Sequence, residues 1–266
     1  MEISIATQAG ASDRANEDST AIGPDLLVVL DGATARTDTG CIHGVAWFTK
    51  HLAQKIKNHA ALGPAAALAE AIGRTADLHR GTCDLSHPGT PSAAVAIVQT
   101  EQGTLRYLVL GDVTVVIAAE GGMHVVSDQR VSSTAAPERA EADAMEATDP
   151  KKAAALVRMK RAELAARNVP GGYWVAAADP TAAKHALTGD IPISEVRQVA
   201  VLSDGAARAV EFGLYDWPSV LDILRESGPD ALIRQVRGAE ASDPEATRWP
   251  RNKISDDATA AYITAL

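Results

Sequence analysis

The sequence predicts one layered domain of the α+β class. Short aliphatic and β-branched runs bounded by Gly, Asp or Pro are typical of buried strands, and several of them follow one another through short glycine turns. Helical patterns occur in pairs between groups of strands, which favours α+β over a regular βαβ alternation. No internal repeat or linker divides the 266 residues, so we expect a single domain over residues 1–266.

The predicted elements follow from these patterns in chain order. Strands are predicted at residues 26–30, 93–98, 105–110, 113–118, 199–202 and 259–265. Residues 41–59 carry an apolar stripe at helical spacing that begins with Ile42, and residues 65–78 carry a second stripe that ends with Leu78. Further helices are predicted at residues 151–166, after Pro218 and after Pro229.

The segment between the two groups of strands has a different character. Residues 127–149 are rich in Ala and Glu without a strong apolar period, so we expect a flap or long loop within an insert at about residues 127–190. The basic residues from Lys151 to Arg167 are expected to form a solvated helix face rather than a docking site. Tyr173 and Trp174 are expected to begin a core strand.

Charge and cysteine content exclude several classes of protein. A formal net charge of -9 disfavours nucleic acid and anionic membranes as partners, and no apolar run is long enough to span a bilayer. We therefore expect a cytoplasmic monomer. Cys41 and Cys83 form no Cys-x-x-Cys pair and are expected to be buried thiols, and the seven histidines show no zinc-binding spacing.

Acidic residues recur where predicted strands begin or end. Carboxylates at the ends of neighbouring strands can converge on one point, and hard cations such as Mg²⁺ and Mn²⁺ prefer oxygen ligands. A single Asp-Gly pair is typical of a hairpin turn, whereas a series of acidic sites favours a metal centre. The five sites are Glu17-Asp18, Asp31-Gly32, Asp112, Asp204-Gly205 and Asp256-Asp257.

The ordered motifs resemble those of the type 2C metal-dependent serine/threonine protein phosphatases, in a divergent bacterial-type form. The resemblance runs from about residue 10 to the C-terminus. It rests on Asn16-Glu17-Asp18, Val29-Leu30-Asp31-Gly32, Gly89-Thr90-Pro91-Ser92-Ala93, Leu110-Gly111-Asp112, Leu202-Ser203-Asp204-Gly205 and Asp256-Asp257-Ala258-Thr259. It implies a four-layer α-β-β-α sandwich of two antiparallel sheets flanked by helix pairs.

The resemblance also implies roles for individual residues. Asp31 would bridge two Mn²⁺ or Mg²⁺ ions, with Asp204 and Asp256 completing one site, and these three aspartates would form the catalytic core. Glu17 and the carbonyl of Gly32 would complete the second site. Asp18 would hydrogen-bond a metal-bound water, and Asp112 would hold a third ion. A metal-bridging hydroxide would then attack phosphoserine or phosphothreonine in a protein substrate.

Three positions depart from the family pattern. Ala33 follows Asp31-Gly32 where the family often has the histidine proposed as general acid, and His43 and His87 are the candidate replacements. Val113 and Thr114 follow Asp112 where the family has Ser-Arg. The phosphate-binding arginine is predicted to be Arg14, one position out of register, with Arg36 as an alternative. The competing function is a non-catalytic pseudophosphatase that acts as a regulatory or binding module.

Overall fold

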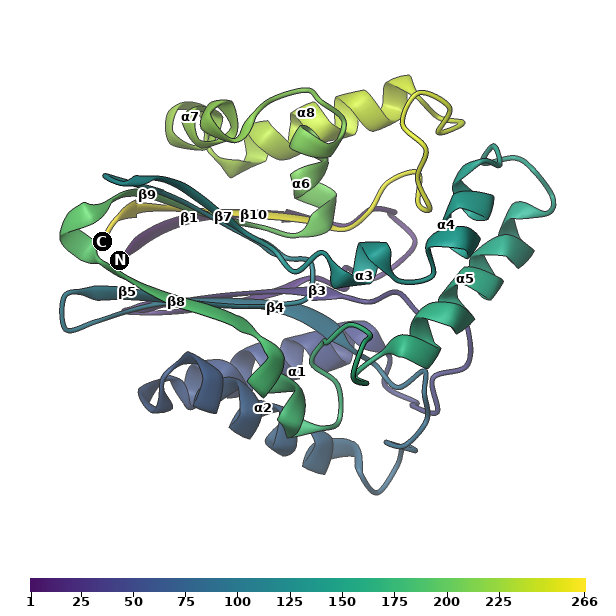
Figure 1. The fold of residues 1–266 in the computed structure, drawn as a ribbon, viewed down its shortest axis with the longest axis horizontal. Helices are drawn as coiled ribbons and strands as arrows, with labels where there is room; N and C mark the ends of the chain where they lie inside the picture. The colour runs from purple at the N-terminus through teal and green to yellow at the C-terminus, as the bar shows by residue number, and fades with distance from the viewer.

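The computed structural model describes all 266 residues and shows two stacked sheets with helices outside them (Figure 1). Neighbouring strands are antiparallel throughout. The first sheet contains, in spatial order, β1 (Glu2–Gln8), β10 (Ala258–Ala265), β9 (Val196–Leu202), β6 (Thr114–Ala119) and β7 (Gly122–Val126). The second contains β2 (Ser19–Gly23), β3 (Leu26–Gly32), β4 (Ala93–Glu101), β5 (Thr104–Leu110) and β8 (Leu187–Pro192). The predicted α+β sandwich is confirmed.

The helices form two outer layers and one group at an end of the sandwich. The second sheet is covered by α1 (Val45–Asn58) and α2 (Pro64–His79), and the first by α6 (Asp204–Glu211), α7 (Trp217–Ser227) and α8 (Pro229–Ser242). Beyond one end of the sheets lie α3 (Arg130–Ser133), α4 (Ala136–Asp143) and α5 (Lys152–Ala166) (Figure 1). Short 3-10 helices occur at Ala60–Leu62, Pro180–His185 and Ile193–Glu195. No helix combines the length and apolar content needed to cross a bilayer.

Strand β3 shows why the continuous apolar runs form central strands. Successive side chains of a strand point to opposite faces of its sheet. Val28 and Leu30 therefore pack beneath α1 and α2, whereas Leu27 and Val29 pack against the other sheet. Both faces of β3 are buried, so an alternation of polar and apolar residues is not needed. This double burial fixes the strand end that carries Asp31.

Several elements differ from the sequence predictions. Helix α1 begins at Val45, so Ile42 lies outside it and is 76% exposed, while Leu78 lies in α2 but is 48% exposed. The strands β1, β2, β7 and β8 and the helix α6 were not predicted. β1 and β7 carry many exposed or half-buried residues, which weakens their apolar signal.

The predicted flap is more ordered than its composition indicates. Residues 127–149 contain α3 and α4 rather than an unstructured loop. Tyr173 and Trp174 are buried as expected, but they begin no strand, and only isolated bridges involve this stretch. The contacts of α4 with α5 provide the tertiary packing that a short polar helix needs.

The double burial of β3 generates a prediction about stability. Replacing Leu27 by Ala should lower the free energy of unfolding by about 2–5 kcal/mol, because the packed layer between the sheets cannot collapse fully into the cavity. Urea denaturation measures this change. The matched control Leu187→Ala, on the edge strand β8 and 41% exposed, should stay within about 0.5 kcal/mol of the parent. Equal losses in both variants would contradict the layer assignment.

Candidate metal centre

Two aspartates meet where the two sheets come together at one end of the sandwich. Asp31 lies near the end of β3 in the second sheet, and Asp204 is the first residue of α6, directly after β9 of the first sheet. The backbone N–H of Asp204 donates a hydrogen bond to Asp31 Oδ2 at 3.1 Å. An acidic residue in the first turn also suits the positive end of the helix dipole. The two predicted core ligands are thus in direct contact.

Gly32 allows the chain around Glu17 to approach this point. A Cβ at Gly32 would lie 2.5 Å from the carbonyl oxygen of Glu17, so any larger residue would push the two segments apart. Thr34 Oγ1 donates to Glu17 Oε2 at 2.5 Å, and the backbone N–H of Glu17 donates to Asp257 Oδ2 at 2.7 Å. Glu17 is held beside Gly32 from both sides.

Asp18 is buried behind these residues. Its Oδ2 accepts hydrogen bonds from Ser203 Oγ at 2.8 Å and from Thr259 Oγ1 at 2.7 Å. Ser203 is therefore a supporting residue. In contrast, Oδ1 of Asp18 and Oδ1 of Asp204 are buried without any hydrogen-bond partner. Buried carboxylate oxygens without donors are costly, and a cation with its water molecules would satisfy them.

The carboxylates raise one another's pKa. Burial raises the pKa of Asp31 well above its usual range, and the negative charge of Asp204 raises it further. Burial, with a contribution from Asp204, raises the pKa of Asp112 to about 7. Burial also raises the pKa of Asp18 to about 7, although hydrogen bonds from Thr259 and Ser203 oppose the shift. A divalent cation would remove this repulsion, so the donor set fits the oxygen-ligated ions that the sequence predicts.

Asp256 differs from the other aspartates because it already has cationic partners. Lys253 Nζ donates to Asp256 Oδ1 at 2.5 Å, and Arg208 Nη2 lies 3.6 Å from Asp256 Oδ2. Arg208 is itself buried and paired with Glu240. The sequence predictions did not include Lys253 or Arg208. The three-residue spacing of Lys253 and Asp256 was a signal, but it is common on surfaces.

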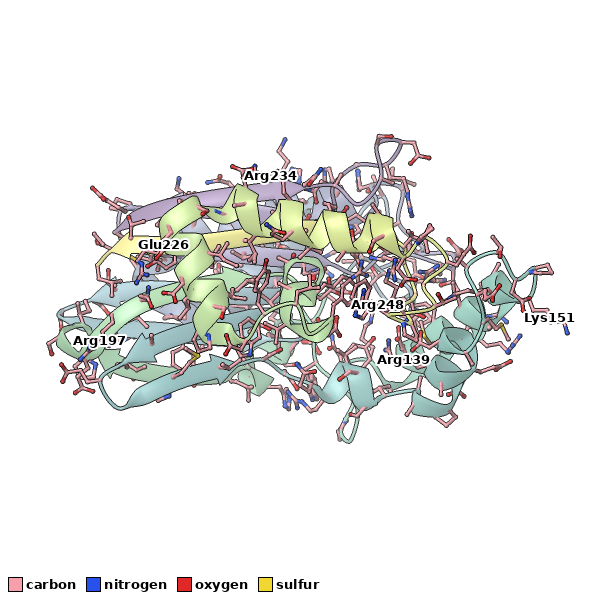
Figure 2. The ribbon with its side chains drawn as sticks, turned by 90° about the horizontal axis from the view of Figure 1, so that it is seen from above. Arg139, Lys151, Arg197, Glu226, Arg234 and Arg248 are labelled. Carbon is pink, nitrogen blue, oxygen red and sulfur yellow. The ribbon has the colours of Figure 1, made fainter.

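A cavity of about 690 Å³ at this end of the molecule is lined by Asp31, Asp112, Asp204 and Asp256, but not by Asp18. Positive side chains surround the acidic group. They are Arg36, Arg139, Lys160, Arg208, Arg248, Arg251 and Lys253. Figure 2 shows Arg139 and Arg248 near the helices at this end, whereas Lys151 extends away at the far tip. An acidic centre surrounded by cations suits an anionic ligand that binds through metal ions.

The remaining predicted site residues are placed differently. Gly32 and Asp112 line the cavity, and Glu17 adjoins it through Thr34 and Gly32. Arg36 also lines it and donates to the carbonyl of Asn252 at 3.1 Å. Arg14 is exposed and is not part of the lining, and neither candidate acid, His43 or His87, reaches it.

The basic residues of the flap do not form one solvated face. Lys151, Arg158 and Arg161 are exposed, as predicted. Lys152, however, is buried and donates to the carbonyl of Met145, and Lys160 lines the cavity. Arg167 donates to the carbonyl of Thr90 at 2.8 Å and to Ser92 Oγ at 3.0 Å. Lys152 and Arg167 therefore form hydrogen bonds between the insert and the rest of the domain.

The raised pKa values of Asp18 and Asp112 predict how stability depends on pH without metal. Each value rises from 3.8 to about 7 on folding, so the folded state keeps protons that the unfolded chain has lost. The contribution of these two carboxyl groups to the free energy of unfolding is complete below their unfolded-state pKa of 3.8. It is lost as pH rises through their folded-state pKa of about 7. Urea denaturation of chelator-treated protein should show falling stability from about pH 4 to about pH 7. The double variant Asp18→Asn, Asp112→Asn should show a shallower fall, and an unchanged slope would contradict the assignment.

The chain resembles known proteins in sequence and in fold. A model of the protein phosphatase 2C family matches residues 7–235. The serine/threonine phosphatase PstP/Ppp of Mycobacterium tuberculosis is 14% identical, with a TM-score of 0.56 over 98% of this chain and 97% of that chain. MsPP of Mycobacterium smegmatis is 17% identical, with a TM-score of 0.55 over 99% and 97%. Stp1 of Staphylococcus aureus is 12% identical, with a TM-score of 0.57 over 98% and 93%. A comparison with curated proteins found no match.

At these identities the solved structures show the fold alone. The family model covers most of the chain and includes the segments around Glu17, Asp31, Asp112 and Asp204, while Asp256 lies beyond its end. On that match, the chain belongs to the protein phosphatase 2C family.

Proposed function

We propose that this protein is a divalent-metal-dependent phosphohydrolase that removes phosphate from phosphoserine and phosphothreonine in proteins. One observation carries the proposal, namely the convergence of buried aspartates from both sheets on a cavity surrounded by cationic side chains. Two of these aspartates are unfavourable without a bound cation. Burial and the charge of Asp204 raise the pKa of Asp31 well above its usual range, and Asp204 has a buried oxygen without a hydrogen-bond partner. Both features suit a site that functions with bound cations.

The proposed ligands are those that the family resemblance implies. Asp31 would help to hold both ions, Asp204 and Asp256 would help to hold one, and Glu17 with the carbonyl of Gly32 would help to hold the other. Asp112 is proposed for a third. The catalytic domain of PstP, 14% identical with a TM-score of 0.53 over 98% of this chain and 96% of that chain, was solved in complex with two manganese ions. When bound, such ions supply an activated water as nucleophile and neutralise phosphoryl charge.

The residues of this chain position the phosphate and the ligands. We assign the phosphate to Arg36, because it lines the cavity and Arg14 does not. The carbonyl of Asn252 and the field of Asp256 hold the guanidinium at the cavity wall. Asp18, fixed by Ser203 and Thr259, keeps one buried oxygen without a hydrogen-bond partner, and we assign that oxygen to a metal-bound water. No histidine is assigned to protonate the leaving group.

A second function is favoured by the pairing of Asp256. Lys253 and Arg208 already supply positive charge beside this aspartate, where a metal ion would otherwise be required. A regulatory module that binds phosphorylated protein without hydrolysing it could use this neutralised arrangement. The two functions differ in one observable, which is metal-dependent turnover.

Turnover of a phosphothreonine peptide with Mn²⁺ tests the enzyme function. Asp31→Asn and Asp204→Asn should each reduce kcat/KM by at least about 100-fold, because even the outer partners of metal ligands contribute about 10- to 100-fold. The control Asp222→Asn changes an exposed aspartate on α7 and should retain parental activity. Metal-independent or absent turnover in the parent, together with retained binding of the phosphopeptide, would favour the regulatory module.

The assignment of the phosphate ligand has its own test. Arg36→Ala should raise KM for the phosphopeptide about tenfold or more, because a hydrogen bond to a charged group is worth about 1.5–3 kcal/mol. Arg14→Ala is the matched control and should raise KM much less. Steady-state kinetics at fixed Mn²⁺ measures both. The reverse order of effects would return the role to Arg14.

A further inference from the structure

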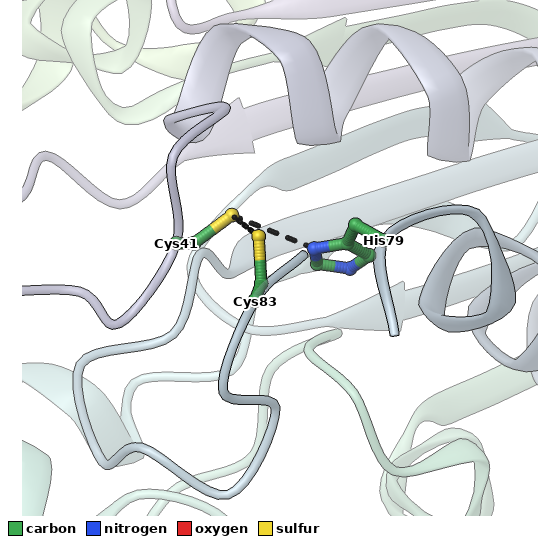
Figure 3. A group of neighbouring side chains, drawn as sticks. All are labelled: Cys41, His79 and Cys83. Carbon is green, nitrogen blue, oxygen red and sulfur yellow. Dashed lines mark hydrogen bonds between the residues drawn. The ribbon is translucent and has the colours of Figure 1, made fainter. Parts of the chain in front are cut away.

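A second group of metal-binding side chains lies outside the cavity. Cys41 precedes α1, His79 ends α2, and Cys83 lies in the loop after α2. Cys41 Sγ lies 3.0 Å from Cys83 Sγ and 3.5 Å from His79 Nδ1 (Figure 3). The three ligand atoms all lie within 4.8 Å of one another. None of the three residues lines the acidic cavity.

The fold creates this group by folding α1 and α2 against each other. The start of α1 and the end of α2 lie at the same end of the pair, as Figure 1 shows. The backbone N–H of Cys83 donates to the carbonyl of His79 at 2.9 Å, which turns the chain back over the imidazole. The N–H of Asp84 donates to the carbonyl of Gly40 at 2.8 Å and joins the two loops. The expectation of two separate buried thiols is therefore wrong, because they are partly exposed and adjacent.

His79 has the properties of a ligand. It is 2% exposed and is held by packing and by the contact of its Nδ1 with Cys41, while its Nε2 has no hydrogen-bond partner. Trp47 packs beside it at 5.2 Å between ring centroids. Burial, followed by the nearby His43, lowers the pKa of His79, which favours the neutral ring that metal binding needs. Nδ1 of this ring is the atom that faces Cys41.

Backbone N–H groups near the two sulfur atoms influence the pKa of both thiols. The N–H groups of His43 and Gly44 interact with Cys41, and those of Ile42 and His43 interact with Cys83. Burial raises the pKa of Cys41, followed by the effect of Cys83. For Cys83, burial acts in the same direction, but hydrogen bonding with Cys41 and Thr82 outweighs it and lowers the pKa. The backbone N–H groups of residues 42–44 thus act to lower the pKa of both thiols, although burial leaves the pKa of Cys41 raised.

We propose that Cys41, His79 and Cys83 bind one Zn²⁺ ion. Two thiolates and an imidazole are the soft and borderline donors that zinc prefers, whereas the oxygen donors of the cavity suit Mg²⁺ or Mn²⁺. The two thiols release their protons to solvent on binding, no electrons are transferred, and two thiolates balance the charge of the ion. The sulfurs must separate slightly to reach zinc–sulfur distances of about 2.3 Å in tetrahedral geometry. Cys41 and Cys83 are partly exposed, so a water molecule would supply the fourth ligand.

The site would join two parts of the domain that otherwise meet through loop contacts. Cys41 belongs to the segment that runs from Gly32 to α1 and carries Arg36, while His79 and Cys83 belong to the end of α2. A bound ion would therefore restrict the segment that carries the proposed phosphate ligand. The same pair of thiols could instead form a disulfide, and the experiment separates the two outcomes.

Co²⁺ is a suitable probe because thiolate ligation gives it a charge-transfer band and tetrahedral geometry gives it strong visible absorption. Reduced, metal-free protein should bind one Co²⁺ with both signals, and one equivalent of Zn²⁺ should displace it. Cys41→Ser, Cys83→Ser and His79→Gln should each weaken this binding by more than about 100-fold. His124→Gln, on the exposed strand β7, is the matched control and should bind normally. Asp31→Asn should also bind normally, so this result does not depend on phosphatase activity.

A measurement on the unmodified chain guards against variants that fail to fold. Zn²⁺ should slow the reaction of both thiols with a thiol reagent, and chelator should restore it. Absence of the charge-transfer band, loss of it in Asp31→Asn, or retention of it in Cys41→Ser would overturn the proposal. A chain that is lighter by two hydrogens under mild reduction and has no reactive thiols would also overturn it, in favour of a disulfide.

Discussion

The hydrogen bond from the Asp204 backbone to the Asp31 carboxylate joins the two sheets at the end of the sandwich that carries the site. Each partner is fixed by its own sheet. Asp31 lies near the end of a strand whose two faces are buried, and Asp204 begins a helix that packs on the other sheet. The acidic centre is therefore a product of how the sheets stack. A change in their packing would move the two carboxylates relative to each other.

The close approach of several buried carboxylates is electrostatically unfavourable. Placing several carboxylates in a buried position opposes their ionisation, as the raised pKa values of Asp18, Asp31 and Asp112 show. The protein offsets part of this repulsion with Lys253 and Arg208 beside Asp256. Burial and Asp256 still raise the pKa of Asp204, although Lys253 and Arg208 oppose the shift. This unequal distribution suits the ligands that we propose for the cavity, which are divalent ions and anionic phosphate.

The sequence was sufficient for the central strands and the carboxylates that follow them. A run such as residues 26–30 is apolar at every position because both faces are covered, and an Asp at its end is easily recognised. Helices α3 and α4 were missed because their stability depends on contacts with other parts of the chain. Lys253 could not be recognised, because its importance depends on how the loop before β10 folds.

The proximity of the two cysteines also could not be predicted from the sequence, because they are far apart along the chain. Cys41 and Cys83 are separated by 42 positions, and only the packing of α1 on α2 brings them together. Nothing in local spacing indicates that His79 faces them. The placement of Arg36 in the cavity lining, with Arg14 outside it, is a further example. Such relations depend on the paths of loops, which apolar periodicity does not encode.

The position of β10 has a consequence for how the protein is made. β10 lies between β1 and β9 in its sheet, and Asp257, just before it, holds the backbone of Gly10 and Glu17. The first and the last strands of the fold must therefore meet before the acidic centre is complete. A chain still attached to the ribosome cannot assemble this centre until residues 256–265 have emerged. The acidic centre consequently assembles only after the rest of this domain has been synthesised.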